Sequence, residues 1–364
     1  MNKKKVAYNT FLHLLLIVGF ATSNPILIGA FILLSLITIL KNFVEYQKTY
    51  SNVKYIAYIY MFCVLFSLFN FLRNDFITFH VILVLIYFFI AIQFSSQKLV
   101  YYYSFKYSFI ILQIFVIGYA INFGFGSFPV IVPFDLLIES SSANGITSYA
   151  VFLQINYSIL KYHFEKKIAY KTVLLTCIIA LMGYGRGSIL SSFLILFISL
   201  FAYLISRNKF NFLFYITVII LLGTYLLNYY FDSIFYFIKA NTKLTAGLVD
   251  SARKLILLEY LNLMDGFGLL FGVGYENSIV ESKFNGNPHN SFIRAHHIFG
   301  LPYLLFVIFY PIKVFFKNRN KTTVFFNIGL LLVLFFRAFS EPIIFPTLLD
   351  IYILTTIIII DNKK

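Results

Sequence analysis

Long apolar runs separated by short polar connections dominate the sequence. They are continuous rather than striped with a 3.6-residue period, and about 20 apolar residues suffice for a helix to cross a bilayer. Such runs predict an all-α, polytopic membrane protein with about twelve transmembrane helices. The predicted spans fall near 7–22, 25–40, 55–72, 76–94, 105–123, 145–160, 168–183, 187–205, 211–231, 296–312, 322–338 and 342–360.

The first run follows a basic start, as in a signal peptide. It has no small-residue cleavage site, and a second run follows at once, so we expect a retained span. If the N-terminus is cytoplasmic, most of the 29 Lys and Arg residues fall in the connections on that side. Because basic residues are enriched in cytoplasmic loops, this predicts cytoplasmic N- and C-termini.

Composition supports this class of protein. The chain is 60% hydrophobic and 12% charged, whereas soluble domains carry about 25% charged residues. A net charge of +15 in a soluble protein would suggest nucleic acid, but here topology explains it and no nucleic-acid partner is expected. Cys63 and Cys177 lie inside apolar runs, which indicates buried reduced thiols.

One long external connection, residues 232–295, divides the spans into 1–231 and 296–364, and a medium external loop covers 124–144. Long loops are usually functional or disordered. Within the long loop, DSARKLILLEYLNLMD (250–265) predicts a helix on or just above the membrane, with Ser251 as a possible N-cap and Asp265-Gly266 as a stop. We expect a glycine-rich turn over 266–277.

Two arginines are candidates for function, because an ionisable group near the hydrocarbon costs about 2.5–3.5 kcal/mol on insertion scales. Arg186 lies in MGYGRGSIL (182–190), where glycines on both sides let the backbone approach a partner. The alternative is an arginine that snorkels to the interface. Arg253 opens the loop helix, and its alternative is an ordinary solvated charge.

Three further charged residues lie near the end of the chain. Arg337 and Glu341 are four residues apart at an outer span end, a spacing that favours a structural ion pair within a helix. Asp350 lies in the last run. It is either a buried partner for one of the arginines or protonated.

Three histidines occur in NPHNSFIRAHHIFGLP (287–302). Metal binding is the weakest interpretation, because His289, His296 and His297 are seven and eight apart and lack neighbouring carboxylates. His296 and His297 are also compatible with the polar lip of a span.

His289 has a different setting, because it follows a predicted turn at Asn287-Pro288. Asn290 and Ser291 can cap the following helix. A neutral imidazole at that position can accept a proton or orient a hydroxyl.

Three segments together resemble bacterial O-antigen polymerases and O-antigen ligases, over roughly residues 170–345. GYGRGSIL is similar to an S-R-G element that follows a mid-chain span. SARKLILLEYLNLMDGFGLLFGVGYEN is similar to the periplasmic helix of the family. PHNSFIRAHHIFGLPYLLF is similar to its H-N motif before a late span.

The resemblance implies a GT-C-like membrane glycosyltransferase at the outer face of the cytoplasmic membrane. A glycan passes from undecaprenyl diphosphate to a sugar hydroxyl without metal, nucleotide or other cofactor. Arg186 and Arg253 match the arginines that hold the diphosphate, and His289 matches the histidine near the acceptor. Where relatives often carry an acidic residue after the H-N motif, this chain has Arg294 and the His296-His297 pair.

The chemistry of these residues fits such a reaction. Fixed guanidinium groups can stabilise a diphosphate leaving group, and His289, with Glu281 in reserve, can take the acceptor proton. Direct displacement predicts inversion at the anomeric carbon. The candidate substrate-binding residues are Arg294, Asn290, Glu281, Arg337 and Glu341.

Several functions stay open. The first choice is a repeat-unit polymerase for O-antigen or capsule, in lipopolysaccharide or capsule biosynthesis. Expected partners are lipid-linked oligosaccharides, membrane lipids, a chain-length regulator and a flippase. A ligase uses the same donor. A flippase or transporter for lipid-linked oligosaccharides would show repeated halves with broken helices, and none are evident. If the protein were a scaffold or a sensor, the position of Arg186 at a glycine turn would have no functional explanation.

Overall fold

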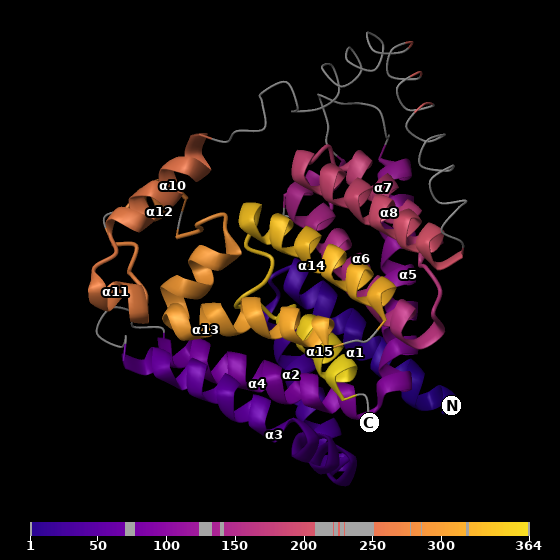
Figure 1. Cartoon of the computed structure of the whole chain (residues 1–364), viewed down its shortest axis with the longest axis horizontal. Coiled ribbons are helices and arrows are strands. Elements are labelled where there is room, and N and C mark those ends of the chain that lie inside the picture. The colour runs from indigo at the N-terminus through magenta and orange to yellow at the C-terminus, as the bar shows by residue number, and fades with distance from the viewer. Residues whose placement is uncertain are drawn as a thin grey trace. The chain divides into compact units, whose positions relative to one another are not determined.

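The computed structural model is built from α-helices, and the residues that it describes include no strand (Figure 1). It describes residues 2–69, 77–123, 133–138, 142–207, 221, 225, 229, 251–276, 278–284, 286–317 and 320–362. The helices are α1 (Lys3–Ala21), α2 (Pro25–Lys41), α3 (Phe43–Phe66), α4 (Ile77–Ser96), α5 (Lys98–Asn122), the 3₁₀ helix η2 (Pro133–Asp135), α6 (Ala143–Glu165), α7 (Tyr170–Met182), α8 (Arg186–Arg207), α10 (Ser251–Asn262), α11 (Gly266–Phe271), α12 (Ile279–Phe284), α13 (Ser291–Phe316), α14 (Lys321–Ser340) and α15 (Asp350–Asp361).

Six helices among the described residues are long and apolar enough to cross a membrane, which supports a membrane-embedded helical protein. They are Phe43–Phe69, Ile77–Ser96, Lys98–Asn122, Arg186–Ile205, Ser291–Phe316 and Lys321–Ser340. The full set of twelve spans stays a prediction. Most of the predicted span 211–231, most of the loop 124–144 and all of residues 232–250 lie outside the described residues.

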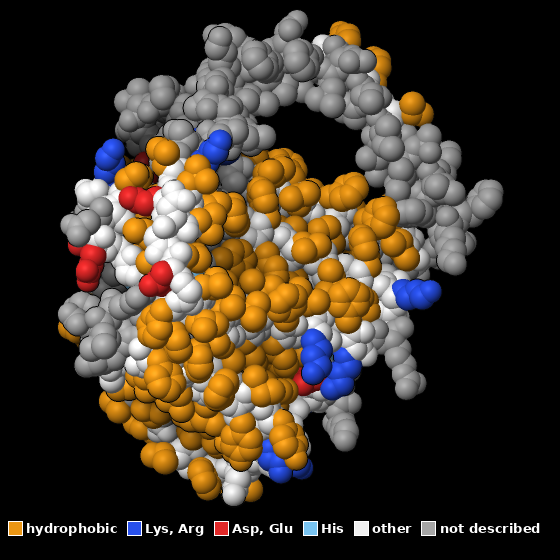
Figure 2. All heavy atoms as spheres, turned by 60° about the vertical axis from the view of Figure 1, so that its left-hand side comes forward, with side chains coloured by type: hydrophobic (Ala, Val, Ile, Leu, Met, Phe, Trp, Pro, Cys, Tyr) orange, Lys and Arg blue, Asp and Glu red, His pale blue; other side chains and the backbone are white. Residues whose placement is uncertain are grey.

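The surface fits a lipid environment. Figure 2 shows hydrophobic side chains over most of the visible face, with Lys, Arg, Asp and Glu toward its margins. On α3, Tyr55, Ile59 and Phe62 repeat at helical spacing and are 71%, 54% and 63% exposed. Apolar patches of this extent are rare on soluble monomers.

The chain forms two compact units. Unit 1 comprises Met1–Ile111, Ser251–Lys317 and Phe335–Lys364, and unit 2 comprises Leu112–Asp250 and Asn318–Leu334. Within unit 2, the helices α6, α7 and α8 pack together. Gln113 on α5 joins them, because its Nε2 donates to Thr172 O and Thr176 Oγ1, each at 2.9 Å.

Polar contacts in unit 1 gather at opposite ends of its helices. At the lysine end, Lys98 Nζ donates to Asn362 O at 2.6 Å, and Lys317 Nζ lies 2.6 Å from Asp361 Oδ1. At the arginine end lie the turn between α1 and α2, the starts of α4 and α13, and residues 341–349. The membrane side that each end faces, and the orientation that the lysine pattern predicts, stay predictions.

The last predicted span, 342–360, is wrong at its start. Residues 341–349 are irregular, and the helix α15 begins only at Asp350. Pro342 and Pro346 explain the difference, because proline lacks a backbone N–H and disfavours helix in the residue before it. The irregular segment brings polar backbone groups to the arginine end.

A loop helix within the predicted range 250–265 is confirmed as α10, Ser251–Asn262. Ser251 is its first helical residue, so the expectation that Ser251 is the N-cap is wrong, and position 250 lies outside the described residues. The glycine-rich turn predicted over 266–277 is wrong in its first half, because residues 266–271 form α11. Asp265 caps α11 by accepting a hydrogen bond from the Gly268 amide. A capping aspartate and the apolar sequence that follows Gly268 outweigh the glycines at this site.

Helix α11 packs into a kink of α13. Gly300, at the kink, has φ +73°, and Gly272, after α11, has φ +98°. A Cβ atom on Gly300 would lie 2.2 Å from Leu270 O, and one on Gly272 would lie 2.4 Å from His296 O. Both positions therefore need glycine for their backbone conformation and for the close approach.

Candidate functional site

Three predicted site residues meet at the arginine end of unit 1. Arg253, in the first turn of α10, places Nη2 3.3 Å from Glu341 Oε1. Arg337, in the last turn of α14, places Nη2 3.6 Å from the same oxygen and donates from Nη1 to Ser340 Oγ at 2.7 Å. The predicted ion pair of Arg337 and Glu341 is therefore confirmed, but it is not within a helix, because α14 ends at Ser340. Arg253 joins the pair from the loop.

The three side chains differ in exposure, and this separates their roles. The Arg337 side chain is 2% exposed, Glu341 15% and Arg253 37%. A buried guanidinium needs a compensating charge, so Glu341 stabilises Arg337 inside the protein. Of the two arginines, only Arg253 has enough exposed surface to contact a ligand, and the shared carboxylate holds its guanidinium in place.

The turn before α13 positions His289 and Asn290. Asn290 is the N-cap as predicted, because its Oδ1 accepts from Phe292 N at 2.8 Å and from Ile293 N at 3.1 Å. His289 has a φ of +49°, and its backbone N–H donates to Asn287 Oδ1 at 2.9 Å. Its ring meets Phe284 edge-on, with centroids 5.4 Å apart. Asn290 thus has a structural role, and His289 lies at the loop side of the helix start.

Ser291 and Arg294 hold the irregular segment to α13. Ser291 Oγ donates to Glu341 O at 2.8 Å and accepts from Ile344 N at 3.3 Å. Arg294 Nη2 donates to Pro342 O at 2.6 Å and to Ile344 O at 3.2 Å. The backbone carrying Glu341 is therefore fixed from α13.

Asp350 closes the same segment. Its carboxylate accepts from the backbone N–H groups of Phe345 and Thr347, each at 2.9 Å. The side chain is buried at 2% exposure. The hydroxyl of Thr347 lies within 3.5 Å of the same carboxylate. The two alternatives for Asp350, a buried partner for an arginine and a protonated acid, both stay predictions.

His296 and His297 tie the loop to the kinked helix. The Leu269 carbonyl can only accept, so His296 Nε2 donates to it at 2.8 Å, and Nδ1 accepts from the Tyr260 hydroxyl at 2.7 Å. Burial raises the pKa of Tyr260, which keeps the phenol protonated for this role.

His297 makes a parallel set of contacts. Its Nδ1 donates to the Val273 carbonyl, and its ring stacks on Tyr275 with centroids 3.8 Å apart. In the part of the chain that the structure describes, no three His, Cys, Asp or Glu side chains group as metal ligands would. The hydrogen bonds of both histidines pack the loop on α13.

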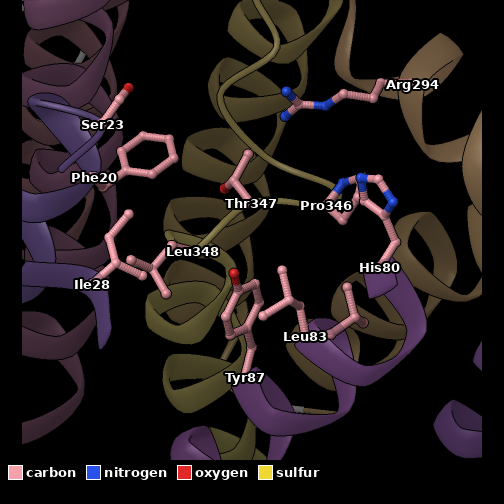
Figure 3. Close-up of a pocket in the computed structure, with 11 residues that line it drawn as sticks. Phe20, Ser23, Ile28, His80, Leu83, Tyr87, Arg294, Pro346, Thr347 and Leu348 are labelled. Carbon is pink, nitrogen blue, oxygen red and sulfur yellow. The ribbon is translucent and has the colours of Figure 1, made fainter. Parts of the chain in front are cut away.

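A cavity of about 310 Å³ lies at the arginine end and includes Arg294 in its wall (Figure 3). We call it the Arg294 cavity. Figure 3 shows the Arg294 guanidinium and the His80 ring at one side, Thr347 in the centre, and Ile28, Leu83 and Tyr87 around the lower part. Its wall comprises Phe20, Ser23, Ile28, His80, Leu83, Val84, Tyr87, Arg294, Pro346, Thr347 and Leu348.

Neither His80 nor the cavity was predicted from the sequence. A single histidine near the start of an apolar run is an indistinct signal. The wall residues come from four separate stretches of the chain, so only the folded structure brings them together.

The two other predicted residues belong to other helices. Arg186 begins α8 in unit 2, and the glycines before it do pack tightly: a Cβ on Gly185 would lie 2.4 Å from Asn144 Oδ1, and one on Gly183 would lie 2.2 Å from a methyl carbon of Thr147. Glu281 is exposed in the first turn of α12. Its reserve role stays a prediction.

Comparison with known proteins adds no assignment, because no family model, curated protein or solved structure matches the chain. The likeness to O-antigen polymerases and ligases therefore rests on the three sequence segments alone.

Proposed function

We propose that the chain is a metal-independent, inverting membrane glycosyltransferase that polymerises lipid-linked repeat units of O-antigen or capsule. It acts at the outer face of the cytoplasmic membrane of a bacterium. The observation that carries this proposal is the cluster of Arg253, Glu341 and Arg337, in which a loop arginine is held at the end of an apolar helix.

The charge of the cluster suits a diphosphate. Two guanidinium groups share one carboxylate, which leaves one net positive charge, and Arg253 is the exposed member. Charge-assisted hydrogen bonds from a fixed guanidinium to an anion are stronger than neutral ones. Such a donor stabilises charge that develops on the leaving group and requires little reorganisation during the reaction.

The proposed step is a direct displacement. The acceptor hydroxyl oxygen bonds to the anomeric carbon of the donor sugar while the bond from that carbon to the diphosphate oxygen breaks. The electron pair of that bond leaves with the lipid diphosphate, which Arg253 binds, with Arg186 as the second proposed donor. His289 takes the hydroxyl proton, and Glu281 is the reserve acceptor. Attack from the opposite face inverts the anomeric carbon.

Arg337 has a different proposed role. At 2% exposure it cannot reach a substrate, so it acts through Glu341, which in turn orients Arg253. Glu341 is likewise a positioning residue rather than a direct ligand. Asn290 acts by capping the helix that follows His289.

Deletion of the gene in the encoding bacterium tests the reaction type. A polymerase predicts single repeat units on undecaprenyl diphosphate and no long glycan. Accumulation of long lipid-linked chains would replace the polymerase by a ligase. An unchanged set of lipid-linked glycans would remove both.

Complementation then tests the residues. We expect Arg253→Ala and Arg186→Ala each to abolish chain extension at a normal protein level, while Lys254→Ala, an exposed neighbour on α10, supports full extension. Full-length polymer from either arginine variant would contradict the donor assignment. Added chelator should leave extension by isolated membranes unchanged, and a requirement for metal would contradict the proposed chemistry.

A further inference from the structure

The Arg294 cavity has a polar part and an apolar part. Arg294 and His80 supply nitrogen donors, and Ser23, Thr347 and Tyr87 supply hydroxyl groups. Apolar side chains, including Ile28, Leu83 and Leu348, form the rest of the wall. Its volume of about 310 Å³ is at the lower end of the range of ligand pockets, about 300–1,000 Å³. A ligand that fits this wall has an anionic or polar head and an apolar chain.

Among the described residues of the wall there is no Asp or Glu, so the side-chain charge of that part is positive. Asp350, in the segment that carries Pro346 and Thr347, is buried and is not among the described wall residues. Its carboxylate accepts hydrogen bonds from the backbone N–H groups of Phe345 and Thr347. It offsets part of the Arg294 charge through space. His80 adds an N–H donor in either charge state, so an anion remains the preferred occupant.

Arg294 is held in a fixed orientation. Its Nη2 donates to the carbonyls of Pro342 and Ile344. These two hydrogen bonds hold the irregular segment to α13. They also leave the Arg294 guanidinium at the cavity, on the same side as His80. A guanidinium fixed in this way binds an oxyanion with less loss of side-chain freedom.

The helices around the cavity favour the same ligand. His80 and Arg294 lie in the first turns of α4 and α13, and Ser23 and Thr347 lie shortly before the first residues of α2 and α15. The N-terminus of a helix carries a partial positive charge. These four wall residues therefore sit near helix starts, a position that favours an anion over a cation.

We propose that the Arg294 cavity binds the phosphate end of a second polyprenyl-type lipid, the carrier of the acceptor repeat unit. This rests on the proposed polymerase function, because a polymerase takes two lipid-linked substrates whereas a ligase takes one. Arg253 binds the diphosphate of the donor, and the Arg294 cavity binds that of the acceptor. Its apolar wall takes the first isoprene units, and the bilayer takes the rest of the chain.

Native mass spectrometry of the purified full chain, with farnesyl diphosphate as the probe, tests the proposal by counting bound lipids. The wild type should bind two per chain. His80→Glu, which adds a carboxylate to the cavity but leaves the Arg294 bonds in place, should weaken one site at least tenfold, and His80→Gln should weaken it less. Arg253→Ala should remove the other site, and Lys254→Ala should retain both.

The outcomes separate this inference from the proposed function. Saturation of the wild type at one lipid that Arg253→Ala removes would overturn the cavity proposal and leave the transferase proposal intact. Two lipids in both the wild type and Arg253→Ala, with one lost in His80→Glu, would support the cavity and contradict the donor assignment. Unchanged binding by His80→Glu would overturn the cavity proposal.

Two more arms complete the test. Inorganic pyrophosphate is then tested as a competitor of farnesyl diphosphate. If it competes with equal affinity, the site takes free phosphate and the lipid assignment is overturned. Farnesol, which lacks the diphosphate, should not compete. If His80→Glu lowers the unfolding midpoint, Leu83→Phe replaces it, because a larger apolar side chain fills the cavity without adding charge. Two bound lipids in Leu83→Phe would then overturn the proposal.

Discussion

The two ends of unit 1 both carry ion pairs, but the pairs differ in kind. At the lysine end, Lys317 lies 2.6 Å from Asp361 and is 68% exposed. At the arginine end, Arg337 is 2% exposed and shares Glu341 with Arg253. Exposed pairs contribute about 0–1 kcal/mol, whereas a buried charge requires its partner. The exposed pair at the lysine end therefore contributes little to stability. The arginine end holds charged groups that are costly to bury, as is common at functional sites.

The largest expected difference between the two ends concerns Glu341. Glu341→Gln leaves the buried Arg337 without its carboxylate, so the free energy of unfolding should fall by about 3–5 kcal/mol. Thermal unfolding of the purified protein measures this change. Glu281→Gln, at an exposed carboxylate, is the matched control and should leave the midpoint unchanged. Equal midpoints for both variants would contradict the buried role of the pair.

The packing of the loop on α13 gives the second effect. Gly300→Ala puts a side chain at φ +73° and 2.2 Å from Leu270 O, so we expect a loss of about 1–3 kcal/mol from the backbone conformation alone. Proteolysis should then cut faster between α10 and α12. Gly29→Ala, in α2 with no neighbour within 4 Å, should be neutral or slightly stabilising. Wild-type resistance of Gly300→Ala would contradict the close approach.

A smaller effect is expected at the histidine contacts. Tyr260→Phe removes the hydroxyl that donates to His296 Nδ1, and the free energy of unfolding should fall by about 1 kcal/mol. Tyr55→Phe, at an exposed tyrosine of α3, should have no effect. A metal-dependent stability that Tyr260→Phe alters would instead revive the metal interpretation of the histidines.

The smallest effect is expected at the lysine end. Lys317→Ala should change the free energy of unfolding by about 1 kcal/mol or less, and added salt should reduce the difference further. A loss as large as that of Glu341→Gln would remove the distinction between the two ends.

Local sequence signals predicted the parts of the arginine end that depend on neighbours in the chain. The spacing of Arg337 and Glu341 gave their ion pair, and Asn290 gave the cap of α13. The apolar runs gave the helices, because length and hydropathy are properties of a continuous segment. The loop helix was predicted in the same way.

The remaining parts depend on contacts between distant segments. Arg253 meets Glu341 across 88 positions, and the Arg294 cavity draws on four stretches of the chain. At the kink, Gly300 lies close to the backbone of α11, about 30 positions earlier in the chain. No local pattern in the sequence indicates that these two segments pack together. Pro342 and Pro346 are a local signal for the irregular segment. The apolar residues around them nevertheless led to the prediction of a continuous span over 342–360.

The most direct test of the account is the rate of glycan transfer by the purified protein from a synthetic lipid-diphosphate donor. We predict that Arg253→Ala lowers this rate by about 10²–10³-fold, with an unfolding midpoint close to that of the wild type and full activity in Lys254→Ala. Wild-type transfer by Arg253→Ala would contradict the claim that this arginine stabilises the leaving diphosphate.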